Sequence, residues 1–259
     1  WSRNSNSSSN NNNMTYCVGL RLNKGLVFMS DTRTNAGVDN ISTYRKMFTW
    51  NRPGECTFVL MTAGNLATTQ GVVSMLEERL KAPEDRNPSI FEVPSMFQAA
   101  KLVGKTLREV IKDSAPDAGP DAESTFRATL ILGGQIKGSP PRLFMIYPEG
   151  NFVEASDETP FFQIGETKYG RPILVRAYDP DMSFAAAVKL LMVSFDSTLK
   201  ANLSVGLPLD LLLYRTDDLD IYRQTRIEDD DPYYAQISDN WGEALKAAFA
   251  SLPDYDVGG

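Results

Sequence analysis

Residues 15–33 read TYCVGLRLNKGLVFMSDTR, and this stretch decides the predicted fold. It contains two apolar runs of strand-forming residues, Thr15–Leu22 and Gly25–Ser30, separated by Asn23 and Lys24, a pair that suits a tight turn. The second run leads directly into Asp31. We therefore expect an antiparallel hairpin that begins at Thr15 and places Asp31 at the end of its second strand.

The rest of the chain predicts further strands and helices in an irregular order. We expect strands at Met47–Asn51, Thr57–Thr62, Arg127–Gly133, Leu143–Tyr147, Phe152–Glu154, Phe161–Ile164 and Leu209–Tyr214. We expect helices at Leu66–Leu80, Ser95–Asp113, Ile173–Arg176, Ser183–Thr198 and Tyr234–Ala250. Groups of strands with paired helices between them indicate an α+β fold rather than a regular βαβ repeat. Since neither an internal repeat nor a linker stands out, residues 15–259 are interpreted as one domain.

Residues 1–14 form a separate segment, because Asn4–Asn13 contains only asparagine and serine. Such a composition cannot build a hydrophobic core. We interpret it as a linker of the kind added for expression, followed by an initiator Met14, with a natural propeptide as the alternative. The distinction affects function, because a peptide bond to Met14 removes the free amine of Thr15.

Composition narrows the function classes. The chain is 42% hydrophobic and 23% charged, as is usual for soluble globular proteins. Its net charge of −7 argues against nucleic-acid binding. The two cysteines, Cys17 and Cys56, do not suggest a disulfide scaffold and favour the reducing cytoplasm. No apolar run approaches the roughly 20 residues that span a membrane, and no secretory signal is visible.

The chain has no histidine. This excludes a serine–histidine triad and a histidine-based zinc site, and it leaves Cys17 without an activating base. The amine of an N-terminal threonine is another possible base, since α-amines have pKa values of about 7.7–8.0. Gly133-Gly134 lacks the lysine of a phosphate-binding loop. We therefore expect no cofactor and no metal.

Five segments carry a family resemblance. The chain resembles the proteasome-type peptidases, a branch of the N-terminal-nucleophile hydrolases, and within them it is similar to the bacterial ancestral beta subunit, or Anbu, family. The segments are Met14–Leu20, Ser30–Gly37, Leu132–Gln135, Ile164–Gly170 and Asn202–Gly206. The resemblance implies a four-layer αββα sandwich of two antiparallel sheets flanked by helices.

The resemblance also implies site residues. Thr15 matches the nucleophile, and its own amine would take the hydroxyl proton. Lys46 would lower the pKa of that amine, and Asp31 would hold the lysine in place. The spacing from Thr15 is slightly short for the family, so Arg45 is an alternative to Lys46. Gly64 would donate its backbone N–H to the oxyanion.

Three later positions match the family pattern less closely. Glu166 stands where proteasome subunits carry a serine, and it would contact the amine or Lys46, or face solvent. Asn202 lies where the family has an aspartate, so it offers only a neutral hydrogen bond. Ser204 is the candidate for a remaining contact to the amine.

The sequence thus predicts a threonine peptidase that cleaves peptides or unfolded proteins and self-assembles into a ring or spiral. The need for an ATP-driven unfoldase is left open. One alternative is a catalytically weak or inactive scaffold of the same fold, which Glu166 and Asn202 favour. A second alternative is an amidase for small metabolites.

Overall fold

The structure is a computed structural model that describes residues 15–35, 41–81, 88–114 and 125–257. The interpretation of residues 1–14 lies outside these ranges. One antiparallel sheet has the strand order β10-β1-β2-β11-β12. Its strands are β1 (Tyr16–Leu22), β2 (Gly25–Asp31), β10 (Phe161–Gly165), β11 (Leu209–Arg215) and β12 (Arg223–Ile227). The predicted hairpin is therefore the centre of this sheet.

A second antiparallel sheet has the order β5-β6-β7-β8-β9. It consists of β5 (Met47–Arg52), β6 (Cys56–Gly64), β7 (Ala128–Ile136), β8 (Arg142–Ile146) and β9 (Phe152–Glu154). Two short strands, β3 (Arg33–Asn35) and β4 (Ile41–Thr43), form a separate two-stranded sheet. In the sequence they lie between β2 and β5.

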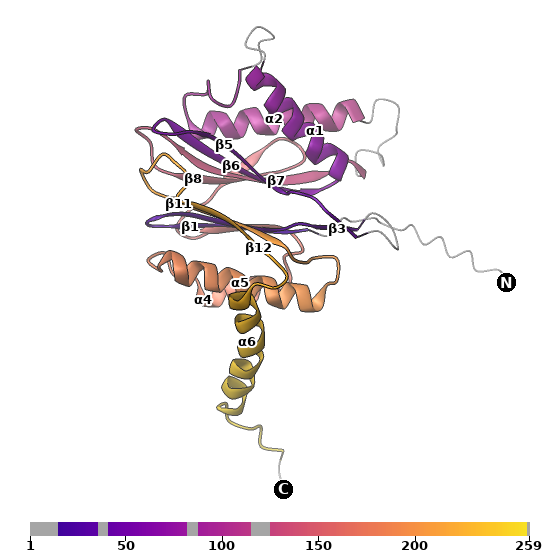
Figure 1. Cartoon of the computed structure of the whole chain (residues 1–259), viewed down its shortest axis with the longest axis vertical. Helices are drawn as coiled ribbons and strands as arrows, with labels where there is room; N and C mark the ends of the chain where they lie inside the picture. Colours follow the sequence, from indigo (N-terminus) through magenta and orange to yellow (C-terminus); the bar gives the residue numbers. More distant parts are fainter. Residues whose placement is uncertain (1–14, 36–40, 82–87, 115–124, 258–259) are drawn as a thin grey trace, which may run out of the picture.

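Helices cover the outer faces of both sheets. Figure 1 shows α1 (Leu66–Lys81) and α2 (Met96–Ser114) over the β5–β9 sheet, and α4 (Arg171–Ala177) and α5 (Phe184–Ala201) over the other sheet. This is the expected α+β fold, a four-layer αββα sandwich, and the prediction is confirmed.

Strand alternation explains why the layers assemble. In β1, Tyr16, Val18 and Leu20 pack in the core beneath α4 and α5, whereas Cys17 packs in the core between the two sheets. Successive side chains of a strand point to opposite faces, so a fully apolar strand serves two cores at once. Burying each large aliphatic side chain contributes about 1.5–3 kcal/mol. The same alternation places Thr15 on the side that faces the opposite sheet.

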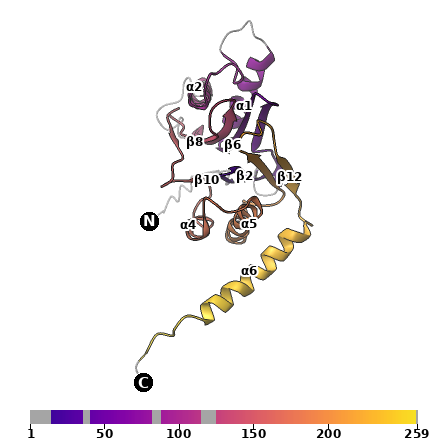
Figure 2. The ribbon, with the colours of Figure 1, turned by 90° about the vertical axis from the view of Figure 1, so that its left-hand side faces the viewer.

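The last helix, α6 (Pro232–Ala250), behaves differently from the others. The Asp231 side chain caps it by accepting a hydrogen bond from the Tyr234 N–H (2.8 Å), and Tyr234 is buried against the body. Beyond this first turn the helix projects away from the sandwich (Figures 1 and 2). Leu245 and Phe249 are exposed there, the latter by 78%.

Most predicted elements appear within a few residues of their expected bounds, but three strands were not predicted. They are β3, β4 and β12. β12 carries no apolar alternation that predicts a strand, because Arg223–Ile227 is mostly polar and exposed. It is an edge strand that pairs only with β11. None of the helices within the described ranges combines the length and apolarity that crossing a membrane needs.

Candidate active site

Thr15 immediately precedes β1 and is only 3% exposed. Its carbonyl oxygen accepts a hydrogen bond from the Glu166 N–H at 2.6 Å. This close approach depends on Gly165, where a Cβ would lie 1.8 Å from the Thr15 carbonyl oxygen. The backbone of Gly165 also has φ +85°, a conformation that favours glycine. The end of β10 therefore fixes the backbone of Thr15.

Asp31 and Lys46 form a buried ion pair beside the start of β1. Asp31 Oδ1 accepts hydrogen bonds from Lys46 Nζ (2.8 Å) and from the Tyr16 N–H (3.0 Å). Lys46 Nζ donates a second hydrogen bond to the Arg33 carbonyl oxygen at 2.6 Å. Burial raises the pKa of the Asp31 carboxyl, and contact with the Lys46 ammonium opposes that rise. The pair brings together two residues predicted from the sequence, and Lys46 rather than Arg45 contacts Asp31.

Gly64 ends β6 with φ +115°, and a Cβ there would lie 2.5 Å from the Arg127 carbonyl oxygen. Two residues earlier, the Thr62 N–H donates to the Lys46 carbonyl oxygen on the β5 side (2.9 Å). Backbone N–H groups alternate sides along a strand, so the Gly64 N–H is directed to that same side. Gly64 lies three residues beyond Met61, the partner of the first residue of β5, so no β5 residue pairs with it.

A cavity of about 20 Å³ lies beside Thr15. Thr15, Lys46 and Gly64 all line it, and Arg45 and Phe48 belong to its wall. Three of the predicted catalytic residues therefore share one space, and Asp31 holds one of them from behind. The arrangement offers a hydroxyl, a fixed cation and a backbone donor around a single small volume.

Glu166, Asn202 and Ser204 form a second group that is joined to Thr15 through the Glu166 N–H. Asn202 Nδ2 donates to Glu166 Oε2 at 3.2 Å, and the Ser204 N–H donates to Asn202 Oδ1 at 3.0 Å. Hydrogen bonds thus connect the three residues to one another, and the contacts of Glu166 and Ser204 with the Thr15 amine stay predictions. They are not among the residues that line the small cavity.

Arg33 is a site residue that the sequence reasoning missed. Its carbonyl oxygen receives Lys46 Nζ, and its Nη1 donates to the Leu203 carbonyl oxygen at 3.1 Å. A Cβ on Gly206 would lie 2.3 Å from Arg33 Nε, so the arginine packs directly on that glycine. Arg33 thereby connects the ion pair to the loop that carries Ser204. Its place directly after Asp31-Thr32 was the available signal, but the backbone role depends on tertiary contacts.

Tyr16 anchors a buried network of hydroxyl and amide groups behind the site. Its hydroxyl lies 2.7 Å from Ser194 Oγ and accepts a hydrogen bond from Gln163 Nε2 at 2.6 Å. Burial raises the pKa of Tyr16 to about 12. The network joins β1, β10 and α5, which are the elements that position Thr15, Glu166 and Asn202.

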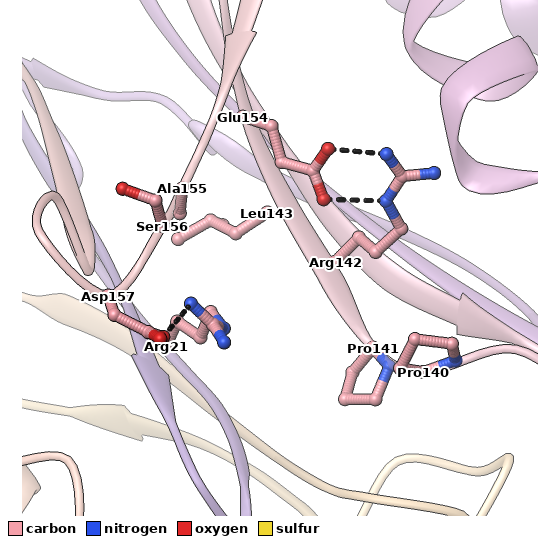
Figure 3. Close-up of a pocket in the computed structure, with 9 residues that line it drawn as sticks. All are labelled: Arg21, Pro140, Pro141, Arg142, Leu143, Glu154, Ala155, Ser156 and Asp157. Carbon is pink, nitrogen blue, oxygen red and sulfur yellow. Dashed lines mark hydrogen bonds and ion pairs between the residues drawn. The ribbon is translucent and has the colours of Figure 1, made fainter.

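A larger cavity of about 350 Å³ lies at the far end of β1 (Figure 3). Arg21 and Arg142 line it, paired with Asp157 and Glu154. None of the predicted site residues belongs to its wall. Within the described ranges, no cluster of histidine, cysteine or acidic side chains has the arrangement of a metal site.

Comparison with known proteins places this geometry in a family context. The proteasome subunit family matches residues 12–206. The structure of Anbu from Yersinia bercovieri is 49% identical, with a TM-score of 0.87 over 95% of this chain and 100% of that chain. Anbu from Hyphomicrobium sp. strain MC1 is 51% identical, with a TM-score of 0.85 over 94% and 100%. The helical assembly of the Anbu complex from Pseudomonas aeruginosa is 45% identical, with a TM-score of 0.86 over 94% and 99%.

Proposed function

We propose that this chain is a threonine peptidase of the N-terminal-nucleophile class. The premise is that it belongs to the proteasome subunit family and to its Anbu branch. The observation that carries this proposal is the shared cavity of Thr15, Lys46 and Gly64, with Lys46 held by Asp31 at 2.8 Å. The proposal requires removal of the residues before Thr15, because only then is its amine free.

In the proposed first step, the neutral amine of Thr15 takes the proton of its own hydroxyl. The hydroxyl oxygen bonds to the carbonyl carbon of the substrate, and the carbonyl oxygen becomes an oxyanion. The Gly64 N–H donates a hydrogen bond to that oxyanion, a contribution of roughly 3–4 kcal/mol in other hydrolases. Cleavage of the C–N bond follows, and the ammonium of Thr15 returns the proton to the leaving amine.

The second step releases the acyl product. Water attacks the ester on Thr15 after giving a proton to the same amine, and the ester C–O bond breaks to restore the hydroxyl. Lys46 favours both steps because its positive charge favours the neutral form of the nearby amine and the developing alkoxide. Asp31 acts as a positioning residue, since it contacts Lys46 and the Tyr16 N–H rather than the cavity.

Glu166, Asn202 and Ser204 are proposed to orient the freed amine. The Glu166 N–H already holds the Thr15 carbonyl oxygen, so Glu166 lies beside the backbone of the nucleophile. Asn202 and Ser204 extend that contact through hydrogen bonds of 3.2 and 3.0 Å. In this role a carboxylate and an amide replace the serine and aspartate of proteasome subunits.

We propose peptides or unfolded proteins as substrates, cleaved within a self-assembled ring or spiral of identical subunits in the cytoplasm. The Anbu complex of Pseudomonas aeruginosa forms a helical assembly, and the exposed Leu245 and Phe249 of α6 give this chain apolar surface for such contacts. The free, buried cysteines Cys17 and Cys56 support a reducing compartment.

A non-catalytic assembly scaffold is the second candidate function. Glu166 in place of the family's serine favours it, and α6 would serve assembly equally well without catalysis. The two candidates differ in one property, the reactivity of Thr15.

The test compares the present chain with a form that begins at Thr15 after methionine removal. Both are treated with a peptide epoxyketone and with a small β-lactone, and the intact mass is measured. We expect one adduct, located on Thr15, only in the form with the free amine. A matched Thr15→Ala form is expected to stay unmodified. Absence of any adduct on the folded, assembled Thr15 form would favour the scaffold.

A further inference from the structure

The cavity beside Thr15 has a positive wall, although the whole chain carries a net charge of −7. Among the residues that the structure describes, the ionisable side chains that line it are Arg45 and Lys46, and none of the lining residues is a carboxylate. Lys46 is already occupied, because its Nζ donates to Asp31 Oδ1 and to the Arg33 carbonyl oxygen. Lys46 is thus paired with a carboxylate, whereas Arg45 is the cation of this lining that has no carboxylate partner among the described residues.

Arg45 is exposed and takes part in none of the ion pairs between residues that the structure describes. Its guanidinium has several N–H donors in a planar fork, which matches a carboxylate in two hydrogen bonds. Phe48, a neighbouring lining residue, adds an apolar wall. A substrate side chain with aliphatic carbons and a terminal carboxylate matches this lining, because the carbons can pack on Phe48 and the carboxylate can pair with Arg45.

The proposed chemistry determines which substrate side chain enters the cavity. The attacked carbon must lie within reach of the Thr15 hydroxyl, with its oxygen toward the Gly64 N–H, and both groups line the cavity. The side chain of the residue that supplies this carbonyl therefore lies against the same wall.

We propose that Arg45 makes this site select an acidic residue, aspartate or glutamate, on the acyl side of the scissile bond. The inference rests on the proposed function, because it needs Thr15 to be the nucleophile. Lys46 activates and Arg45 selects, so two adjacent basic residues have separate roles. A hydrogen bond between charged groups corresponds to a preference of about tenfold or more over a neutral side chain of the same shape.

The test uses the form that begins at Thr15 and four peptide epoxyketones that differ only in the residue carrying the reactive ketone: Glu, Gln, Leu or Lys. The second-order rate of adduct formation is read from the intact mass. We expect the Glu compound to react about tenfold faster than its isosteric Gln counterpart. The ratio of these two rates is internally controlled, since both compounds meet the same protein.

Variants then assign the preference to Arg45. Arg45→Gln is expected to reduce the Glu-to-Gln ratio to about one, Arg45→Lys to retain part of it, and Arg45→Glu to make the Lys compound react faster than the Glu compound. The matched control is Arg176→Glu, which makes the same charge change on the exposed face of α4 and is expected to leave the ratio unchanged.

Two failures are distinguishable. Equal rates for the Glu and Gln compounds, or a preference that survives Arg45→Glu, would overturn the role of Arg45 while Thr15 remains the nucleophile. Absence of adducts from all four compounds and from the small β-lactone would overturn the proposed function and this inference with it.

Discussion

The two ends of strand β1 carry charged side chains in opposite environments. Thr15 begins the strand beside the buried pair of Asp31 and Lys46, whose side chains are 0% and 7% exposed. Arg21 stands near its other end, about 20 Å away, and pairs with Asp157, which is 94% exposed. Figure 3 shows this far end with its second pair, Arg142 and Glu154.

The difference teaches that the burial of an ion pair, rather than its presence, decides how much the structure depends on it. A buried pair loses hydration on both sides and persists only with further hydrogen bonds, which Tyr16 and Arg33 supply to Asp31 and Lys46. An exposed pair costs little to make and contributes little. We therefore expect substitutions at the Thr15 end to have larger effects than equivalent ones at the far end.

The largest expected effect on stability comes from Lys46→Met, which removes the cation and leaves the Asp31 carboxyl buried alone. We expect the free energy of unfolding to fall by about 3–5 kcal/mol, measured by urea denaturation. Adding Asp31→Asn to this variant should recover part of the loss, because no uncompensated charge remains.

Arg21→Met provides the matched change at the far end. Because Asp157 stays hydrated without its partner, we expect a loss of at most about 1 kcal/mol in the same assay. A cost for Lys46→Met no greater than that for Arg21→Met would remove the proposed contrast between the two ends.

An intermediate effect is expected from two glycines at opposite ends of β6. Gly64→Ala combines a positive φ with overlap on the Arg127 carbonyl oxygen, so we expect a loss of about 3 kcal/mol together with loss of Thr15 labelling. Gly54→Ala also has a positive φ, but its Cβ meets nothing within 4 Å. It should cost about 1 kcal/mol and leave labelling intact.

Equal losses for the two alanine variants in urea denaturation would show that backbone strain alone matters at Gly64. Normal labelling of a folded Gly64→Ala variant would exclude its N–H position as critical for the oxyanion. Either result would weaken the distinction between the Thr15 end of the molecule, where Gly64 lies, and the opposite end, where Gly54 lies.

The sequence was sufficient to predict the layered fold because apolar alternation and turn residues are local signals. Tyr16, Val18 and Leu20 alternate with Cys17 along β1, and the structure assigns them to the two cores that this pattern requires. The end of β7 was less predictable. Gly133 and Gly134 resemble a strand end, yet β7 continues through them to Ile136. Gly133 is needed there because a Cβ would lie 2.5 Å from the Phe28 ring.

The sequence named site residues at positions that match a family pattern, whether through a side chain or through the backbone. Thr15, Lys46 and Gly64 were named from sequence and share a cavity, although their catalytic roles remain predictions. The contribution of Arg33 was missed, because its carbonyl oxygen binds Lys46 and its guanidinium packs on Gly206 only after folding. Its place directly after Asp31-Thr32 marked the position, but backbone acceptors and close approaches of distant loops depend on tertiary contacts.

The most direct test of the central claim is the rate at which a small β-lactone labels Thr15 in the form that begins at this residue, compared with its folded Lys46→Met variant. If the buried lysine activates the threonine, labelling of the parent should be fast and that of the variant slower by about a hundredfold or more. Equal rates in the two folded proteins would contradict the account, because Thr15 would then react without Lys46.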